Sequence, residues 1–443
     1  MMKRILAVCT VLSLQAEADM NHLRRLAPAS ENVALCTDNC ETIVNSRQLP
    51  EVTYFPGDLT GGYRADLGLT LSKGLNGKRL TTGDKAVVLA NGGVSSQLFH
   101  THADGACTIP KSNGDGWYYV SNSEVRDEVV ASSFTCGRRR QSNSEGIGNG
   151  GVGAIEFNAA GEVIGYERLL TRTSANCGGG LTYWGTWVSC EENDQSGRLY
   201  EVDPNTGYTQ RIQAVDRGGN YESFAYDNQD PNVPARFFVT EDIANGALIR
   251  YTPAANAFTT GNNYDILNSP GGTFEYLVLN DNGTYSWSTD RGAGEQSAAR
   301  YFPNTEGIDV FNRQMFFVSK ATRNLIQVDL SGDTFSITST LSGQFNLYPD
   351  QLGRILESSG GNNDVLYFCE DGGSNSDIHG RDASGKYFTI VEGTDFDTET
   401  TGLAFSPNAM FMYVAFQDPS AIFAFWRDDG LPFSGTVAGI KYH

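Results

Sequence analysis

The chain has 443 residues, of which 40% are hydrophobic, and a formal net charge of −20. This acidic balance argues against binding to nucleic acid or to an anionic membrane surface, because like charges repel. The 50 glycines and the 11% of aromatic residues suit strands joined by tight turns better than long helices. The charge has two readings: an acidic site that binds cations, or a surface that keeps an exported protein soluble.

The first 18 residues have the pattern of an export signal. Residues 1–4 form a basic start, residues 5–14 are apolar, and residues 16–18 form an A-x-A cleavage site. We expect cleavage near Ala18 and a protein secreted to the medium or the periplasm. The apolar stretch is too short to span a bilayer and no later stretch is long and apolar enough, so we expect no transmembrane segment.

The cysteine count suggests one special thiol. One of the eight cysteines would leave with the signal, and the remaining seven cannot all pair. Local spacing favours Cys36 with Cys40 and Cys107 with Cys136, although spacing does not fix connectivity. In an oxidising compartment one thiol is then free, intermolecular or bound to a metal. We expect that thiol to be Cys177, with an inert buried thiol as the alternative.

The chain after the signal divides into an arm and a set of repeats. Residues 19–50 are polar with little periodicity, and we interpret them as an N-terminal arm. Six later runs share one form, a β-branched or aromatic strand that ends in small and polar or acidic residues. They are residues 117–122, 186–191, 237–241, 316–320, 366–370 and 412–417. Their separation of roughly 45 to 80 residues is the scale of a four-stranded propeller blade with insertions. We predict an all-β fold, a six-bladed β-propeller over residues 51–443.

A propeller carries strand ends that are far apart in the sequence to one axial face. Acidic residues at these ends can therefore form one site, although each acid alone could simply cap a turn. His102, Asp104 and the Glu370–Asp371 pair stand at turns where a cation could bind, but we favour a plain turn role because Asp-Gly is an ordinary turn pair. The G-x-G-x-x-G run at residues 148–153 leads into an alternating strand, so it does not predict a dinucleotide site.

The stretch from Ser174 to Asn193 carries the most chemistry. Cys177 is followed by three glycines, and a strand then leads to the glutamates at 191 and 192. Glycines let the backbone approach a ligand, a thiolate is a soft metal ligand, and the glutamates offer hard oxygen atoms. Such a mixed set suits iron, with further carboxylates left for calcium.

This stretch resembles the signature of the PhoX-type alkaline phosphatases, in which an Asn-Cys-small-Gly-Gly run leads through Thr-Pro-Trp-Gly-Thr-Trp to Cys-Glu-Glu. Tyr183 stands where that family commonly has proline. Shorter matches, to the family's Asn-His-Glu, Gly-Arg-Phe-x-His-Glu, Arg-Pro-Glu, Ser-Pro-Asp-Gly and Glu-x-Thr-Gly elements, extend along most of the chain beyond the arm. Their acids are, in that order, Glu124, Glu222, Glu306, Asp350 and Glu399. The first two matches lack the family histidine.

The resemblance implies a six-bladed propeller with an axial cluster of Fe³⁺ and Ca²⁺ that hydrolyses phosphate monoesters. It assigns Cys177 and Glu192 to iron, and it does not sort the five further acids between the two metals. It also implies catalytic roles for four of these ligands, Cys177, Glu192, Glu222 and Glu306.

One departure weakens the phosphatase reading. Asn304 stands where the family has the arginine of Arg-Pro-Glu, which is expected to hold the phosphate. An amide offers one polar contact in place of a charged fork. Lys320 or Arg323 could substitute, or both could be surface charges.

We therefore expect a secreted, monomeric, metal-dependent phosphatase acting on a small phosphate ester. Two alternatives remain: a non-catalytic calcium-stabilised binding propeller, and a hydrolase of another ester class.

Overall fold

The structure is a computed structural model that describes residues 51–126, 150–355, 364–433 and 439–443. By its internal contacts the chain divides into two units, residues 1–51 and residues 52–443, and the second unit holds the fold described below. The predicted signal peptide and N-terminal arm lie outside the described residues, as do Cys36, Cys40 and Cys136.

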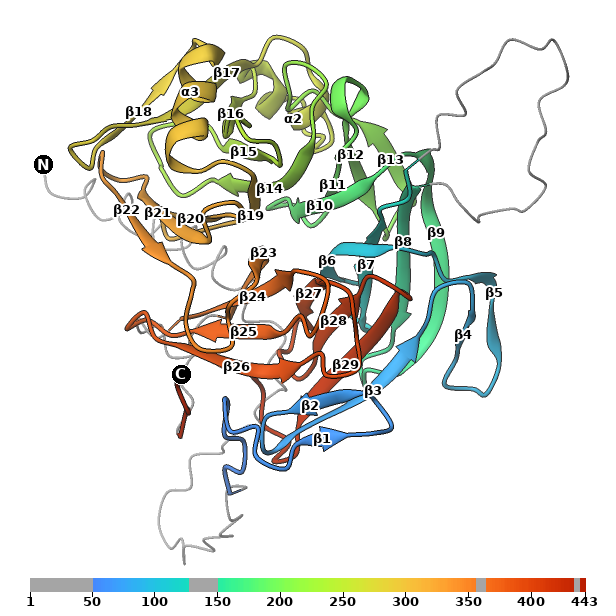
Figure 1. Cartoon of the computed structure of the whole chain (residues 1–443). Coiled ribbons are helices and arrows are strands. Elements are labelled where there is room, and N and C mark those ends of the chain that lie inside the picture. The colour runs from blue at the N-terminus through green and yellow to red at the C-terminus, as the bar shows by residue number, and fades with distance from the viewer. Residues whose placement is uncertain (1–50, 127–149, 356–363, 434–438) are drawn as a thin grey trace, which may run out of the picture. The chain divides into compact units, whose positions relative to one another are not determined.

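Six antiparallel sheets are arranged in a ring, which confirms the six-bladed propeller (Figure 1). From the axis outward, the first blade is β6 (Ala103–Pro110), β7 (Trp117–Ser123), β8 (Gly150–Phe157) and β9 (Val163–Thr173). The second is β10 (Asn176–Leu181), β11 (Trp187–Glu191), β12 (Leu199–Asp203) and β13 (Tyr208–Arg211). The third is β14 (Tyr221–Asp227), β15 (Arg236–Glu241), β16 (Ile249–Thr252), β17 (Thr273–Leu279) and β18 (Tyr285–Ser288).

The fourth blade is β19 (Thr305–Phe311), β20 (Gln314–Ser319), β21 (Asn324–Asp329) and β22 (Phe335–Ser339). The fifth is β23 (Tyr348–Ile355), β24 (Val365–Asp371), β25 (Ile378–Arg381), β26 (Tyr387–Glu392), β2 (Leu69–Leu71) and β1 (Tyr63–Arg64). The sixth is β27 (Thr400–Phe405), β28 (Met412–Phe416), β29 (Ala421–Arg427) and β3 (Leu75–Thr81). A separate hairpin pairs β4 (Ala86–Val88) with β5 (Val94–Leu98).

The sixth blade closes the ring, because its outer strand β3 comes from the start of the propeller and pairs with β29 near its end. Gly77 lies opposite Phe425 in this pair. A Cβ at Gly77 would lie 2.6 Å from the Phe425 ring, so the glycine leaves room for that ring. The closure joins the start of the propeller to its last blade, so β3 and the last strand of the ring, β29, share one sheet.

Helices within the described residues are few and short. They are η1 (Asp194–Ser196), η2 (Ala255–Thr259), α2 (Asp265–Asn268) and α3 (Arg291–Tyr301). Helix α3 follows the third blade, and the Asp290 side chain caps it by accepting the Gly292 N–H at 2.9 Å. None of these helices is long and apolar enough to cross a bilayer.

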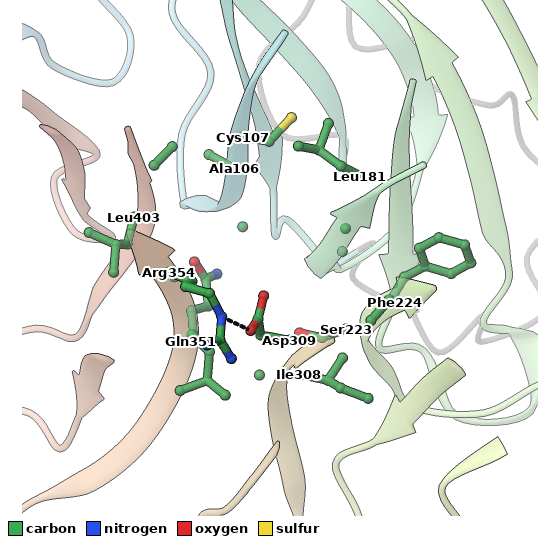
Figure 2. A pocket seen from close by; sticks show the side chains of 18 of the residues that line it. Ala106, Cys107, Leu181, Ser223, Phe224, Ile308, Asp309, Gln351, Arg354 and Leu403 are labelled. Atoms are coloured by element: carbon green, nitrogen blue, oxygen red, sulfur yellow. Dashed lines mark hydrogen bonds and ion pairs between the residues drawn. The ribbon is translucent and has the colours of Figure 1, made fainter. Parts of the chain in front are cut away.

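The innermost strands of all six blades line a cavity of about 390 Å³ along the axis (Figure 2). Its wall is mostly apolar, as at Ala106, Leu181 and Leu403, and an ion pair joins Arg354 Nε to Asp309 Oδ2 at 2.7 Å. None of the acids predicted as metal ligands lines this cavity.

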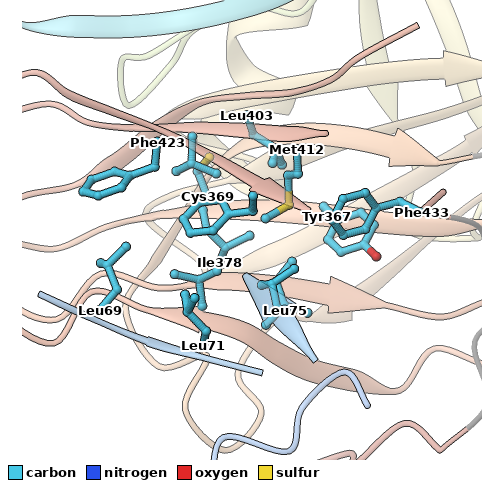
Figure 3. Close-up of a cluster of buried hydrophobic side chains, with 14 of the residues drawn as sticks. Leu69, Leu71, Leu75, Tyr367, Cys369, Ile378, Leu403, Met412, Phe423 and Phe433 are labelled. Carbon is cyan, nitrogen blue, oxygen red and sulfur yellow. The ribbon is translucent and has the colours of Figure 1, made fainter. Parts of the chain in front are cut away.

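The hydrophobic core lies between neighbouring sheets, and Figure 3 shows its part between the fifth and sixth blades. Leu69, Leu71 and Leu75 from the N-terminal strands are buried there with residues such as Tyr367 and Met412. Full burial of such a side chain contributes about 1.5–3 kcal/mol. The N-terminal strands therefore help to hold these two blades together.

A β-bulge recurs near the start of every innermost strand. In each blade, two consecutive residues of the innermost strand have no partner on the second strand, and the register of the pair shifts there. The shifts lie between residues 103 and 106, 176 and 179, 221 and 224, 305 and 308, 349 and 352, and 401 and 404. A bulge re-aims the side chains of its unpaired residues. The six bulges are therefore equivalent positions around the axis.

Candidate metal centre

In five of the six blades, the first unpaired residue of the bulge has a carboxyl or thiol side chain, the types that can ligate a metal ion. In blade order these residues are Asp104, Cys177, Glu222, Glu306 and Asp350, and the sixth position is Gly402. Apart from Cys177, which is half-buried, each of the five is at most 6% exposed. One repeated backbone feature thus places four carboxyl groups and one thiol around the axis.

A second set of polar residues stands where the second strand of each blade ends. They are Glu124, Glu192, Asp242, Lys320, Asp371 and Gln417. In the first four blades the backbone N–H of this residue donates to the carbonyl two residues before the bulge residue, over 2.8–2.9 Å. The set is therefore placed by the same local geometry in successive blades.

Residues of these sets form two groups of potential ligands. Asp104, Glu124 and Cys177 each offer one ligand atom within 4.8 Å of the others. Glu222, Glu306 and Asp350 form a second group by the same measure. Three or more such atoms at this separation can surround one cation, whose ligands lie about 2.0–2.6 Å from it.

The structure brings the predicted ligands together at this end of the innermost strands. Glu192 joins the first group through Arg126, whose Nη2 lies 2.5 Å from Glu192 Oε2 and 3.3 Å from Glu124 Oε1. Glu399 precedes β27, and its pKa is raised by burial and by the charges of nearby acids, first of all Asp104.

Asp104, Asp242, Asp371 and Arg126 also belong to this region, and the sequence reasoning missed them as site residues. Asp104 is more than a turn residue, because it is 2% exposed and accepts hydrogen bonds from Gln351 Nε2 at 2.8 Å and Gln417 Nε2 at 2.9 Å. One signal was present in the sequence. Asp104-Gly105, Cys177-Gly178 and Glu306-Gly307 are three ligand-glycine pairs at equivalent places.

The Cys177 bulge is fixed by contacts that leave little room for change. Asn122 Nδ2 donates to the carbonyls of Cys177 and Gly178 at 2.7 and 2.6 Å, and Asn122 Oδ1 accepts from Trp187 Nε1 at 2.9 Å. A Cβ at Gly178 would lie 2.3 Å from the Glu222 carbonyl oxygen. The glycine therefore lets the backbone next to Cys177 approach Glu222 of the third blade closely.

The electrostatics indicate a shortage of positive charge. Burial and the charge of Glu124 raise the pKa of Asp104 to about 7. Burial raises the pKa of Glu192 to about 8, although Arg126 lowers it. Burial and neighbouring acids also raise the pKa values of Glu222 and Cys177.

The buried Glu222 Oε1 has no hydrogen-bond partner. A cation bound among these groups would offset the repulsion between the buried carboxylates and would give Glu222 Oε1 a partner. The mixed thiol and carboxyl donor set fits metal ions.

Lys320 lies inside the cluster and is not a surface charge. Its Nζ is 2.7 Å from Asp371 Oδ2, 3.0 Å from Glu306 Oε1 and 3.6 Å from Asp242 Oδ2. Burial lowers the pKa of Lys320, but the carboxylates outweigh burial and raise it overall. Asn304 holds Asp242 through a 2.8 Å hydrogen bond from Nδ2 to Oδ1.

Four of the cysteines lie within the described residues. Cys107, Cys177, Cys190 and Cys369 are all free thiols, so the odd count does not single out Cys177. Cys107 is a free thiol buried in an apolar cluster with Ile109 and Val120, and the partner favoured for it, Cys136, lies outside the described residues. What distinguishes Cys177 is its setting, since it alone of the four belongs to a group of potential ligands.

Fold and site together define a six-bladed β-propeller with a cluster of carboxyl groups and one thiol where its innermost strands begin. No family model and no curated protein matches the chain.

Among solved structures, the chain is similar to PhoX of Pseudomonas fluorescens in complex with vanadate, a transition state analogue. The TM-score is 0.62 at 15% identity, over 88% of this chain and 100% of that chain. It also matches XC5397, a gluconolactonase of Xanthomonas campestris, with a TM-score of 0.41 at 12% identity, over 91% and 99% of the two chains. The first of these similarities supports the propeller fold.

Proposed function

We propose that the chain is a metal-dependent phosphatase that hydrolyses small phosphate monoesters at this cluster. The observation that carries the proposal is the recurrence of a thiol or carboxyl side chain at five equivalent bulges. Support also comes from the sequence resemblance to PhoX-type phosphatases and from the propeller fold shared with a PhoX structure that holds vanadate.

In this proposal Cys177 and Glu192 hold Fe³⁺, while Glu124, Glu222, Glu306, Asp350 and Glu399 hold iron or Ca²⁺. Asp104 joins the ligands because it shares a group with Cys177 and Glu124. When bound, these ions would supply positive charge against the phosphate and Lewis acidity for the attacking and leaving oxygens.

The side chains beside the cluster would bind and orient the ester. The Arg126 side chain lies next to Glu124 and Glu192 and is 55% exposed, so its guanidinium can bind the phosphate of an ester that comes from the solvent. Lys320 would offer a second cation from within the cluster. Asn304 would act mainly by holding Asp242, because its amide nitrogen is already engaged there.

We further propose that residues 1–18 are a cleaved signal peptide, that residues 19–50 form an arm, and that the mature protein is a secreted monomer.

The test measures metal content by elemental analysis and hydrolysis of a chromogenic phosphomonoester in the same samples. Cys177→Ala is expected to lose iron and activity together. Cys190→Ala is the matched control, since Cys190 is a buried free thiol on the adjacent strand β11. Iron-free wild-type protein with full activity would overturn the proposal.

A second candidate, a metal-binding propeller without catalysis, is favoured by Asn304 in place of the expected arginine. The variant Asn304→Arg separates the two. Phosphatase activity that appears only in this variant would identify the native chain as the non-catalytic form.

A further inference from the structure

A second group of potential ligands lies in the fifth blade and plays no part in the proposed reaction. It consists of Glu370 at the end of β24, Asp377 just before β25, and His379 on β25. Their exposed fractions are 0%, 5% and 0%, and one ligand atom from each lies within 4.8 Å of the others. Two acids and an imidazole are therefore buried against one another.

His379 is held with one ring nitrogen occupied and the other directed at the acids. Its Nδ1 lies 2.9 Å from Thr389 Oγ1, and its ring stacks on Phe345 with centroids 4.2 Å apart. Its Nε2 is 3.1 Å from Glu370 Oε2, yet it is a buried atom without a hydrogen-bond partner. Glu370 Oε2 is thus close to His379 Nε2 without forming a hydrogen bond with it, so this ring nitrogen can take a metal ion as its partner.

The acids of this group accept hydrogen bonds from backbone N–H groups but form no ion pair with a lysine or arginine among the described residues. Glu370 Oε1 accepts from the N–H groups of Asn346 and Leu347 at 3.1 and 3.0 Å, and Asp377 Oδ1 accepts from Gly393 N–H at 3.1 Å. Among the ion pairs of the described residues, neither acid has a lysine or arginine.

Glu241 is the residue of the third blade equivalent to Glu370, and it has an arginine partner. Glu241 ends β15 as Glu370 nearly ends β24, and Glu241 Oε2 pairs with Arg291 at 2.5 Å. A buried carboxylate without such a partner is costly, so the fifth blade lacks a charge that the third blade supplies.

We propose that Glu370, Asp377 and His379 bind one divalent transition-metal ion, such as Zn²⁺, at a site separate from the axial cluster. Imidazole nitrogen and carboxylate oxygen are common ligands of such ions, at about 2.0–2.2 Å. His379 Nε2 and Glu370 Oε2 lie 3.1 Å apart without a hydrogen bond between them, as two neighbouring ligands of one ion do. The Nδ1 contact with Thr389 resembles the outer hydrogen bond that orients a ligating histidine.

The position of this site gives it a structural role. Glu370 and Asp371 are consecutive on β24, and consecutive strand side chains point to opposite faces. The ion would therefore fix the strand that carries Asp371 toward Lys320 and the axial cluster. Asp377 also lines a cavity of about 470 Å³.

The experiment uses the full chain freed of metal and titrated with Co²⁺ while proton NMR is recorded. We expect one exchangeable, strongly shifted imidazole N–H signal, that of His379 Nδ1, because Nε2 would hold the ion. The signal should vanish in His379→Gln and persist in His443→Gln, whose ring contacts the same Thr389 hydroxyl at 3.1 Å. It should also persist in Cys177→Ala, so failure of the axial cluster and failure of this site are distinguishable.

Crystals of the wild-type chain grown with Zn²⁺ provide a test that needs no variant. An anomalous peak between Glu370, Asp377 and His379 is the expected result. The proposal is overturned by the absence of that peak, or by a shifted signal that remains in folded His379→Gln.

Discussion

Asp104 and Cys177 occupy the same position in adjacent blades, and their side chains meet with Cys177 Sγ 3.7 Å from Asp104 Oδ2. Each is the first unpaired residue of a bulge, so the backbone turns both toward the axis in the same way. The residue types differ while the geometry repeats. A site of low symmetry can therefore arise from a fold with nearly equivalent blades.

Asp104→Asn tests whether this acid is a ligand. The amide keeps the size of the side chain but removes its charge, so we expect metal bound with Cys177 and Glu124 to fall at least ~10-fold in affinity. Elemental analysis after dialysis against a limiting chelator measures this loss. Asp309→Asn is the control, since Asp309 lies on innermost strand β19 but faces the axial cavity. Equal metal loss in both variants would contradict a specific role.

Lys320→Met tests the internal cation. Without the ammonium group, Glu306, Asp242 and Asp371 lose their shared partner, and removal of one member of a buried ion pair costs about 3 kcal/mol. Urea unfolding of the metal-free protein measures this loss, and added Ca²⁺ should restore more stability to the variant than to the wild type. Lys111→Met is the comparison, because Lys111 pairs with one carboxylate, Glu156, at 2.6 Å. A similar loss of stability in both variants would show that Lys320 contributes no more than a lysine paired with one carboxylate.

The blades were predictable because each leaves a local pattern. The six runs found in the sequence coincide with the second strands of the blades, β7, β11, β15, β20, β24 and β28. The aliphatic and aromatic residues of these strands are buried on both faces of the blade. The number of blades followed from counting these runs. The closure of the ring by β3 could not be found in this way, because it depends on pairing with residues more than 300 positions later.

The site was predictable only in part for a related reason. Cys177 and Glu192 stand in one recognisable stretch, whereas Asp104 looks like an ordinary turn residue before Gly105. Its role depends on a register shift between β6 and β7. The sequence of one strand does not determine its register with another strand. Arg126 could not be found from the sequence, because its short contact is with Glu192, 66 residues away, and a charged residue two positions after Glu124 has no distinguishing pattern.

The pH dependence of stability should reveal the crowded carboxyl groups. The pKa values of Asp104 and Glu192 are raised to about 7 and about 8, above their ordinary values near ~4. The folded metal-free protein therefore binds more protons than the unfolded chain between these values. This contribution to stability is complete below pH ~4 and is lost as pH rises through 7 to 8, by up to ~1.4 kcal/mol per pH unit for each group.

Thermal unfolding of chelated protein at several pH values between ~4.5 and ~8.5 measures this slope. The double variant Asp104→Asn, Glu192→Gln removes both groups and should flatten it. Saturating metal should flatten it too, because the ion replaces the protons. A slope that is unchanged in the double variant would show that other groups cause it.

Gly178→Ala tests the close approach of the second and third blades. The added Cβ would lie 2.3 Å from the carbonyl oxygen of Glu222 and 2.5 Å from its Oε1, so strand β10 must move away from β14. Overpacking of this kind costs about 1–3 kcal/mol, and the movement separates Cys177 from Glu222. We therefore expect lower stability together with lost metal. In the control Gly332→Ala the nearest atom, Asp329 Oδ2, is 3.4 Å from the new Cβ, so stability should change by no more than ~0.5 kcal/mol. Full metal content in a stable Gly178→Ala protein would mean that the cluster does not depend on this contact.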